Sequence, residues 1–93
     1  MTSFVVKLQV NDFDAWKQVY DQFADMRREK GVDSSVVLRD ATDAHAVWVI
    51  HHFPTAEGAR AFARSSELRE AMRQSGVVGH ELWFLQEVER FVY

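Results

Sequence analysis

The chain has 93 residues, of which 47% are hydrophobic, and a formal net charge of −3 at pH 7. This length, with a single proline, predicts one domain that spans residues 1–93. The lack of cysteine excludes disulfides, thiolate metal sites and a cysteine nucleophile. Acidic and basic residues are interspersed without a basic block, which argues against nucleic-acid binding. We find neither a signal-peptide pattern nor an apolar run of the ~20 residues that span a membrane, so we expect a soluble, cytoplasmic protein without membrane association.

The first third of the chain predicts a strand followed by a long helix. Residues 4–10 (FVVKLQV) alternate between an apolar face and a mixed face that carries Lys7 and Gln9. Asn11 and Asp12 are suitable N-cap residues, and apolar residues then recur at spacings of three and four over residues 13–30. A cationic last turn and Gly31 mark the end of this predicted helix.

The rest of the chain predicts two strands, a second helix and a last strand. Residues 34–39 and 46–53 form a hairpin around a polar turn. Thr55 is a plausible N-cap for a helix that breaks or bends at Ser65 and Ser66 and then resumes until Gly76. The final strand is expected over residues 79–90.

This order, β-α-β-β-α-β, predicts an α+β, ferredoxin-like fold: a four-stranded antiparallel sheet with two helices on one face. The third strand is apolar on both faces, as is much of the fourth, which is typical of strands covered on both sides. Two helices cover only one side of the sheet. We therefore expect the uncovered face to bind the same face of a second copy, as a homodimer.

Three stretches carry a resemblance to a known family: FVVKLQVNDFDAWKQVYDQF, LRDATDAHAVWVIHHF and TAEGARAFARSSELREAMRQSGVVGHELWFL. Together they span nearly the whole chain, which resembles the dimeric α+β barrel superfamily and, within it, small proteins similar to antibiotic biosynthesis monooxygenases. The resemblance implies paired sheets that form a barrel, with a cavity in each subunit. It also implies activities such as cofactor-independent oxygenation of polyketide anthrones, cyclisation or haem degradation.

Two adjacent histidines end the third strand, in the stretch VWVIHHFP. Neighbouring strand residues face opposite ways, so His51 and His52 cannot both serve one pocket. The alternation predicts that His51 faces the helices and that His52 faces the open side with Lys7 and Gln9. We choose His52 as the candidate base, although a register slip of one residue would exchange the two rings.

Lys7 is the second candidate catalytic residue, as a cation that faces an enolate or phenolate. Its alternative role is an ion pair between subunits. The candidate substrate contacts are an aromatic pair, polar neighbours of Lys7 and residues near them: Gln9, Trp48, Ile50, Trp83, Glu81 and Tyr20. Trp48 and Trp83 could equally be the core of a dimer.

Taken with the activities that the resemblance implies, these residues predict an enzyme that removes a proton from a small aromatic, polyketide-type metabolite and stabilises the enolate, which then reduces oxygen without a cofactor. A cyclase or isomerase would use the same residues, and a non-catalytic ligand-binding dimer is the remaining alternative. No spacing of His, Asp and Glu matches a metal motif. The resemblance implies that a haem-degrading member would hold the iron with a histidine of the second helix, and residues 55–75 contain none. We therefore expect neither metal nor cofactor.

Overall fold

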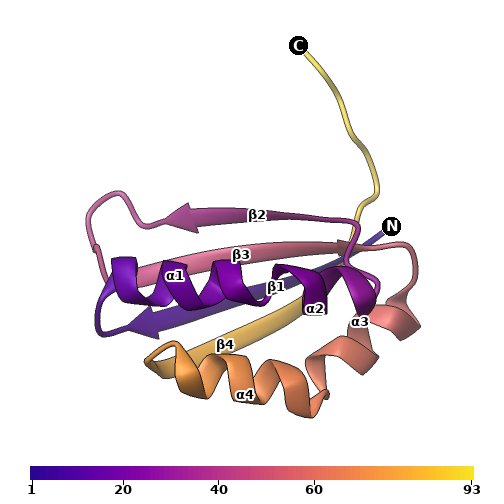
Figure 1. Cartoon of the computed structure of the whole chain (residues 1–93). Helices are drawn as coiled ribbons and strands as arrows, with labels where there is room; N and C mark the ends of the chain where they lie inside the picture. Colours follow the sequence, from indigo (N-terminus) through magenta and orange to yellow (C-terminus); the bar gives the residue numbers. More distant parts are fainter.

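The computed structural model describes residues 1–93 as four strands and four helices. Their order along the chain is β1 (Thr2–Val10), α1 (Phe13–Gln22), α2 (Ala24–Glu29), β2 (Ser34–Arg39), β3 (Ala46–Phe53), α3 (Ala56–Ala63), α4 (Ser66–Gln74) and β4 (Val77–Gln86). The strands form one antiparallel sheet in the order β2-β3-β1-β4, and the helices all cover the same face of it (Figure 1). The predicted α+β, ferredoxin-like fold is confirmed. None of the helices combines the length and the apolar character that crossing a membrane requires.

The core lies between the sheet and the helices, where alternate side chains of β1 and β3 point. Phe4 pairs with His51 and Val6 pairs with Val49 in the antiparallel register, and all four side chains are buried. The other strand face carries Lys7 opposite Trp48. The predicted assignment of the two faces of β1 and β3 is therefore confirmed, and we call the side without helices the open face.

The long helix predicted for residues 13–30 is divided into α1 and α2 at Phe23. The carbonyl of Tyr20 accepts from the Phe23 backbone N–H at 3.2 Å and from Nη1 of Arg27 at 2.7 Å. The Tyr20 carbonyl thus accepts from the tightened turn at Phe23 and from Arg27 in place of the next hydrogen bond of the regular helix. The apolar periodicity continues through this turn, so it concealed the break.

The second break was predicted and is confirmed. The Ser65 hydroxyl donates to the carbonyl of Phe62 at 2.7 Å, and Ser65 Oγ also accepts from the backbone N–H of Leu68 at 3.2 Å. One side chain therefore closes the end of α3 and caps the start of α4. The N-cap roles predicted for Asp12 and Thr55 are confirmed as well.

Strand β4 begins and ends earlier than predicted. Its last residue, Gln86, pairs with Thr2 at the start of β1, so the residues that follow have no β1 residue to pair with. At the other end, an irregularity between Gln9 and Val10 shifts the register and brings Val77 into the ladder. The prediction of residues 79–90 was wrong at both ends because these limits depend on the partner strand.

Candidate functional site

Five of the predicted site residues come together on the open face. Lys7 is directly opposite Trp48 on one side and Glu81 on the other. The rings of Trp48 and Trp83 stack with centroids 5.7 Å apart, and the Lys7 ammonium lies 5.4 Å from the Trp48 centroid. A polar hollow of about 160 Å³ adjoins them, lined by Lys7, Gln9, Gly79, His80 and Glu81.

His52 lies at the opposite end of this face. It is four residues along β3 from Trp48, a separation of about 13 Å at the usual rise of a strand. Its Nδ1 lies 3.0 Å from the hydroxyl oxygen of Ser3, and Ile50 lies between it and Trp48 in the strand. The structure therefore does not bring the candidate base His52 to the candidate cation Lys7.

The remaining predicted residue, Tyr20, lies on the helix side of the sheet, in a pocket between the sheet and α1, α2 and α4. The free space amounts to about 50 Å³. Eleven of the fourteen lining residues are hydrophobic, among them Trp16, Phe23, Met26, Leu68 and Met72. The exceptions are Arg27, His51 and Ser75, so the polar groups among them are a guanidinium, an imidazole and a hydroxyl.

His51 is buried in the wall of this pocket with a defined tautomer. Its Nδ1 lies 3.1 Å from the carbonyl oxygen of Phe4, which can only accept, so Nδ1 carries the proton and Nε2 carries a lone pair. Every fully buried side-chain nitrogen or oxygen of the chain has a hydrogen-bond partner. Nε2 of His51 has no hydrogen-bond partner, so it is not fully buried. Nε2 must therefore reach accessible space, and the pocket that His51 lines provides it.

The surroundings of His51 keep it neutral. Its ring packs against Phe4 and Phe62, with centroids 5.4 and 5.2 Å away. Burial lowers the pKa of His51 from 6.5 to about 4, the Phe4 carbonyl opposes this shift, and the nearby charge of Arg27 adds to it. At neutral pH, His51 thus presents an unprotonated nitrogen to the pocket.

Arg27 supplies the positive charge of the pocket. Its guanidinium carbon lies 3.6 Å from the centroid of the Tyr20 ring, and Nη1 donates to the Tyr20 carbonyl. It is half-buried and forms no ion pair within the chain. Burial lowers the pKa of Arg27, but a guanidinium stays protonated at neutral pH. The pocket therefore contains a cation with no carboxylate at ion-pair distance, because the nearest acidic influence, Asp21, is itself paired with Lys17.

Tyr20 contributes a wall of the pocket. Its ring lies between Arg27 and Trp16, whose centroid is 5.0 Å away in a stacked arrangement. Its hydroxyl is engaged with Oγ of Ser35 on β2 at 2.8 Å. Tyr20 can thus form an aromatic surface for a ligand and hold Arg27 in place, while its hydroxyl ties α1 to the sheet.

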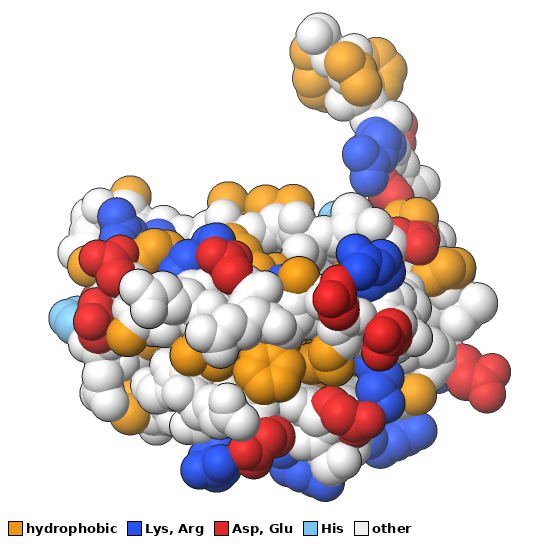
Figure 2. Space-filling view, in the orientation of Figure 1, with side chains coloured by type: hydrophobic (Ala, Val, Ile, Leu, Met, Phe, Trp, Pro, Cys, Tyr) orange, Lys and Arg blue, Asp and Glu red, His pale blue; other side chains and the backbone are white.

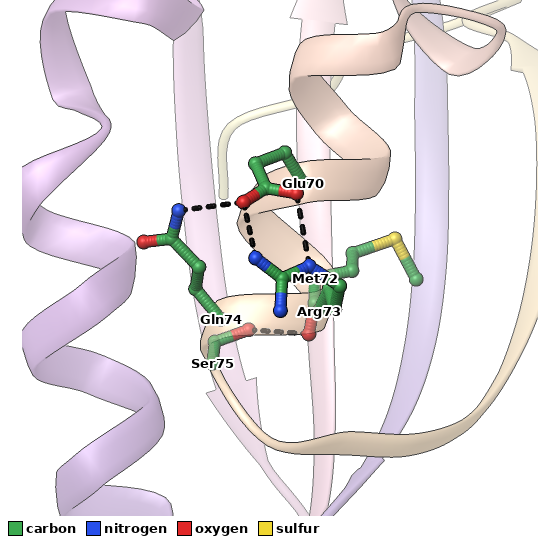
Figure 3. Close-up of polar contacts among 5 residues, drawn as sticks. All are labelled: Glu70, Met72, Arg73, Gln74 and Ser75. Carbon is green, nitrogen blue, oxygen red and sulfur yellow. Dashed lines mark hydrogen bonds and ion pairs between the residues drawn. The ribbon is translucent and has the colours of Figure 1, made fainter.

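The end of α4 closes the pocket. The Ser75 hydroxyl donates to the Met72 carbonyl at 3.1 Å, while Glu70 binds Arg73 and Gln74 on the outer side of the helix (Figure 3). Figure 3 shows the Met72 thioether directed away from this outer cluster. Met72 and Ser75 line the pocket. Its free space of about 50 Å³ is smaller than an aromatic ring compound, so binding requires side chains such as the unbranched, flexible Met72 to move aside.

Arg27 was not predicted as a site residue from the sequence. Arg27 belongs to a run of cations near a helix end, where such residues are typical without any further role. The informative signal was its position seven residues after Tyr20, which places both on one side of a helix. His51 was recognised as facing the helices, but nothing in the sequence showed that a pocket lies there.

Comparison with solved structures shows which proteins share this fold. SnoaB from Streptomyces nogalater, a cofactor-independent oxygenase, superposes with a TM-score of 0.80 at 12% identity, over 96% of this chain and 94% of SnoaB. The monooxygenase ActVA-Orf6 of Streptomyces coelicolor, solved in complex with nanaomycin D, gives 0.74 at 22% identity, over 99% and 91% of the two chains. Rv0793 from Mycobacterium tuberculosis gives 0.73 at 10% identity, over 96% of each chain.

This is the fold of the antibiotic biosynthesis monooxygenases. The expected resemblance to these proteins is confirmed at the level of structure. No protein-family model matches the sequence, and no curated protein matches it either. Since the identities are low, the fold is what the likeness shows, and the chemistry has to be argued from the residues of this chain.

Proposed function

We propose that the chain is an enzyme that binds a small phenolic or enolisable aromatic compound in the pocket between sheet and helices and oxygenates it without a cofactor. One observation carries the proposal: a neutral histidine with a free Nε2 and an arginine that forms no ion pair share one apolar pocket. SnoaB and ActVA-Orf6, which share the fold, are an oxygenase and a monooxygenase, and this supports the type of reaction.

Proton removal is the first step of the proposed reaction. Nε2 of His51 accepts a proton from an acidic C–H or phenolic O–H of the substrate, and Arg27 pairs with the oxygen that becomes negative. The low pKa of free His51 makes it a weak base. The enolate lies next to the imidazolium and raises its pKa toward the ordinary value, as an opposite charge does in a dry pocket.

Molecular oxygen is the oxidant. For an anthrone, the carbanion at the CH₂ carbon gives one electron to O₂, and the two radicals combine to a peroxide. Loss of water then leaves a carbonyl, so that a CH₂ group and O₂ give a C=O group and H₂O. Apolar walls around the enolate favour this route because they exclude the water that would reprotonate it.

Oxygen uptake with a 1,8-dihydroxyanthrone tests the proposal. His51→Asn retains a donor for the Phe4 carbonyl but removes Nε2, and Arg27→Met removes the charge at similar length. We expect uptake above the spontaneous rate in the parent and a large loss in both variants, with melting temperatures that show that they fold. His52→Gln and Lys7→Met are the matched changes at the residues predicted from the sequence.

The pattern across these four variants separates the two sites. Loss confined to His51 and Arg27 supports the helix-side pocket, whereas loss confined to His52 and Lys7 would move the chemistry to the open face. Uptake equal to buffer in every protein would refute the oxygenase. A cyclase or a ligand-binding dimer, which need the same pocket, would then be tested by binding of a dihydroxyanthraquinone.

We further propose that the open face pairs with the open face of a second copy. Several of its large apolar side chains are more than a third exposed: Val36, Leu38, Trp83 and Leu85. Lys7 and Glu81 have opposite charges on this face and form no ion pair within the chain, although they are direct neighbours in the register. A two-fold axis through the face can bring each Lys7 to the Glu81 of the other copy.

A further inference from the structure

Helix α4 forms one wall of the helix-side pocket and is only loosely packed. Its side chains Leu68, Ala71 and Met72 line the pocket, and each of them is only partly buried. No residue of α4 is fully buried, whereas α1 and α3 each bury at least one large apolar side chain. Elements with few buried apolar contacts open at a low cost in free energy, so α4 is the wall best suited to move.

The opposite wall is anchored to the sheet. Helix α2 follows α1 after a single turn at Phe23, and α1 is tied to β2 by the contact of Tyr20 with Ser35. Beyond α2, the backbone N–H of Asp33 donates to the carbonyl of His52 on β3 at 2.8 Å. These bonds hold α2 against the sheet at both ends, so an opening of the pocket falls to α4.

The backbone at the two ends of α4 is suited to act as a hinge. At its start, Ser65 has extended backbone angles, with φ −70° and ψ 144°, between α3 and α4. At its end, Gly76 has a φ of +76°, which glycine adopts without strain. Apart from its chain neighbours, no atom lies within 4 Å of the place where a Cβ of residue 76 would stand. Rotation at these two residues therefore swings α4 as one unit.

One ion pair connects α4 to the opposite wall. The cluster of Figure 3 joins residues 70–75 to one another, and the Ser66 hydroxyl bonds Glu67 in the same helix. Nζ of Lys30, at the end of α2, lies 2.8 Å from Oε2 of Glu67, in the first turn of α4. No other side-chain hydrogen bond or ion pair joins α4 to another element.

The Lys30–Glu67 pair crosses the pocket from wall to wall. Lys30 follows the lining residues Met26 and Arg27 by about one helical turn, and Glu67 directly precedes Leu68. Figure 2 shows apolar side chains along the seam between the α1–α2 row and α4, with charged side chains on both sides of it. The pair thus bridges the seam at which the two walls would separate.

The pocket is too small in this state for the ligand of the proposed function. Its free space is about 50 Å³. An apolar cavity that takes up a single benzene molecule has a volume of about 150 Å³. A substrate with two or three fused rings therefore needs a wall of the pocket to move before it enters.

We propose that α4 is a hinged lid of the pocket and that the Lys30–Glu67 ion pair holds this lid closed. The use of the lid in ligand entry rests on the proposed function, whereas the opening itself needs no ligand. Both side chains of the pair are more than a third exposed. An exposed ion pair is weak and is screened by salt, so the lid is closed most of the time and still opens readily.

Labelling of an introduced cysteine measures the opening without a ligand, because the chain has no cysteine of its own. Val49 lies on the floor of the pocket and is 2% exposed, whereas Val47, on the same face of β3, is 0% exposed and lies outside the pocket. We expect 4,4′-dithiodipyridine, a neutral aromatic disulfide, to label Val49→Cys roughly tenfold faster than Val47→Cys, or more. Equal rates would mean that both thiols are reached only by unfolding of the whole domain, and would overturn the lid.

Charge reversal in the Val49→Cys protein tests the ion pair. Lys30→Glu and Glu67→Lys each replace an attraction by a repulsion, so each should raise the labelling rate about two- to tenfold. The double reversal restores the pair and should return the rate to that of the parent. Arg28→Glu, which breaks an ion pair within α2, is the matched control and should leave the rate unchanged. Single reversals without effect, a double reversal that does not restore the rate, or an equal rise in the control would overturn the role of the pair.

Stopped-flow binding of 1,8-dihydroxyanthraquinone, followed by tryptophan fluorescence, tests the use of the lid. We expect Lys30→Glu to raise the association rate constant by about the same factor as the labelling rate. An unchanged association rate beside faster labelling would show that the ligand does not enter past α4, and would overturn the lid as its entrance. A parent that binds no anthraquinone would contradict the proposed function, while the labelling rates would still decide whether α4 opens.

Discussion

Arg27 and Arg28 are neighbours in the sequence and have the same type of side chain, but their environments differ. Arg27 is half-buried over the Tyr20 ring, whereas Arg28 is exposed and pairs with Asp25. If Arg27 stabilises an enolate, Arg27→Met should lower kcat/KM by about 10²–10³-fold, the usual effect of removing one such group. Arg28→Met is the matched control, and equal losses in both variants would contradict the role of Arg27.

His51 predicts a pH dependence of stability. Its pKa is about 4 when folded and 6.5 when unfolded, so the unfolded chain takes up a proton first as the pH falls. The free energy of unfolding is therefore highest above pH 6.5 and falls progressively toward pH 4. The total loss is ~3 kcal/mol, at about 1.4 kcal/mol for each unit of difference between the two pKa values.

Urea unfolding between pH 7 and pH 4 measures this effect, with His51→Phe as the comparison. The phenyl ring cannot take up a proton, so the variant should lose much less stability over the same range. The exposed Glu67 and Glu70 also have lowered pKa values, of about 2, but their contribution to acid unfolding begins only as the pH approaches 4.5 and below. An unchanged slope in the variant would show that other groups control the acid response.

At the scale of the elements, Ser65, the serine between α3 and α4, makes hydrogen bonds to the ends of both helices. Ser65 both donates to Phe62 and caps α4, while the Ser66 hydroxyl contacts only the exposed Glu67. Ser65→Ala should cost ~1 kcal/mol of unfolding free energy, as other N-cap deletions do, and Ser66→Ala should stay within about 0.5 kcal/mol. Thermal or urea unfolding of the two variants measures the difference, and equal values would contradict the capping role.

Alternation and capping made most of the fold predictable from the sequence. The bounds of β2 and β3, the faces of His51 and His52, the caps at Asp12 and Thr55 and the helix break at Ser65 all follow from local patterns and are confirmed. What local patterns could not show depends on distant partners. Strand β4 ends at Gln86 because β1 begins opposite it, and the first helix breaks where Arg27 takes a carbonyl seven residues earlier.

The site was less predictable than the fold for the same reason. The alternation correctly separated Lys7 from the helix side. It did not give the pairing register, which sets Lys7 opposite Trp48, some 13 Å along the strand from His52. The pocket forms from α1, α2, α4 and the sheet together, so no single stretch carries its pattern. The aromatic substrate, the independence of cofactors and the cytoplasmic location remain predictions.

At the scale of the whole molecule, we propose separate roles for the two faces of the sheet: the helix side binds the ligand and the open side binds a second copy. Trp83→Glu places a charge in the apolar open face and should raise the dimer dissociation constant at least tenfold, since an unpaired charge is costly to bury. Sedimentation over a range of concentrations measures it. Val78→Glu, on the same strand and also exposed, is the control, and equal effects would contradict an interface centred on the tryptophans.

The three tryptophans allow the most direct test of where the ligand binds. Trp16 lines the helix-side pocket, whereas Trp48 and Trp83 stack on the open face, so the indole N–H signals in a ¹⁵N spectrum report the two sites separately. We would titrate the protein with 1,8-dihydroxyanthraquinone, which has the shape of the oxygenated product and does not react further. We expect a saturable shift of the Trp16 signal with the Trp48 and Trp83 signals unchanged. Shifts of Trp48 and Trp83 with Trp16 unchanged would contradict it and would place the ligand on the open face.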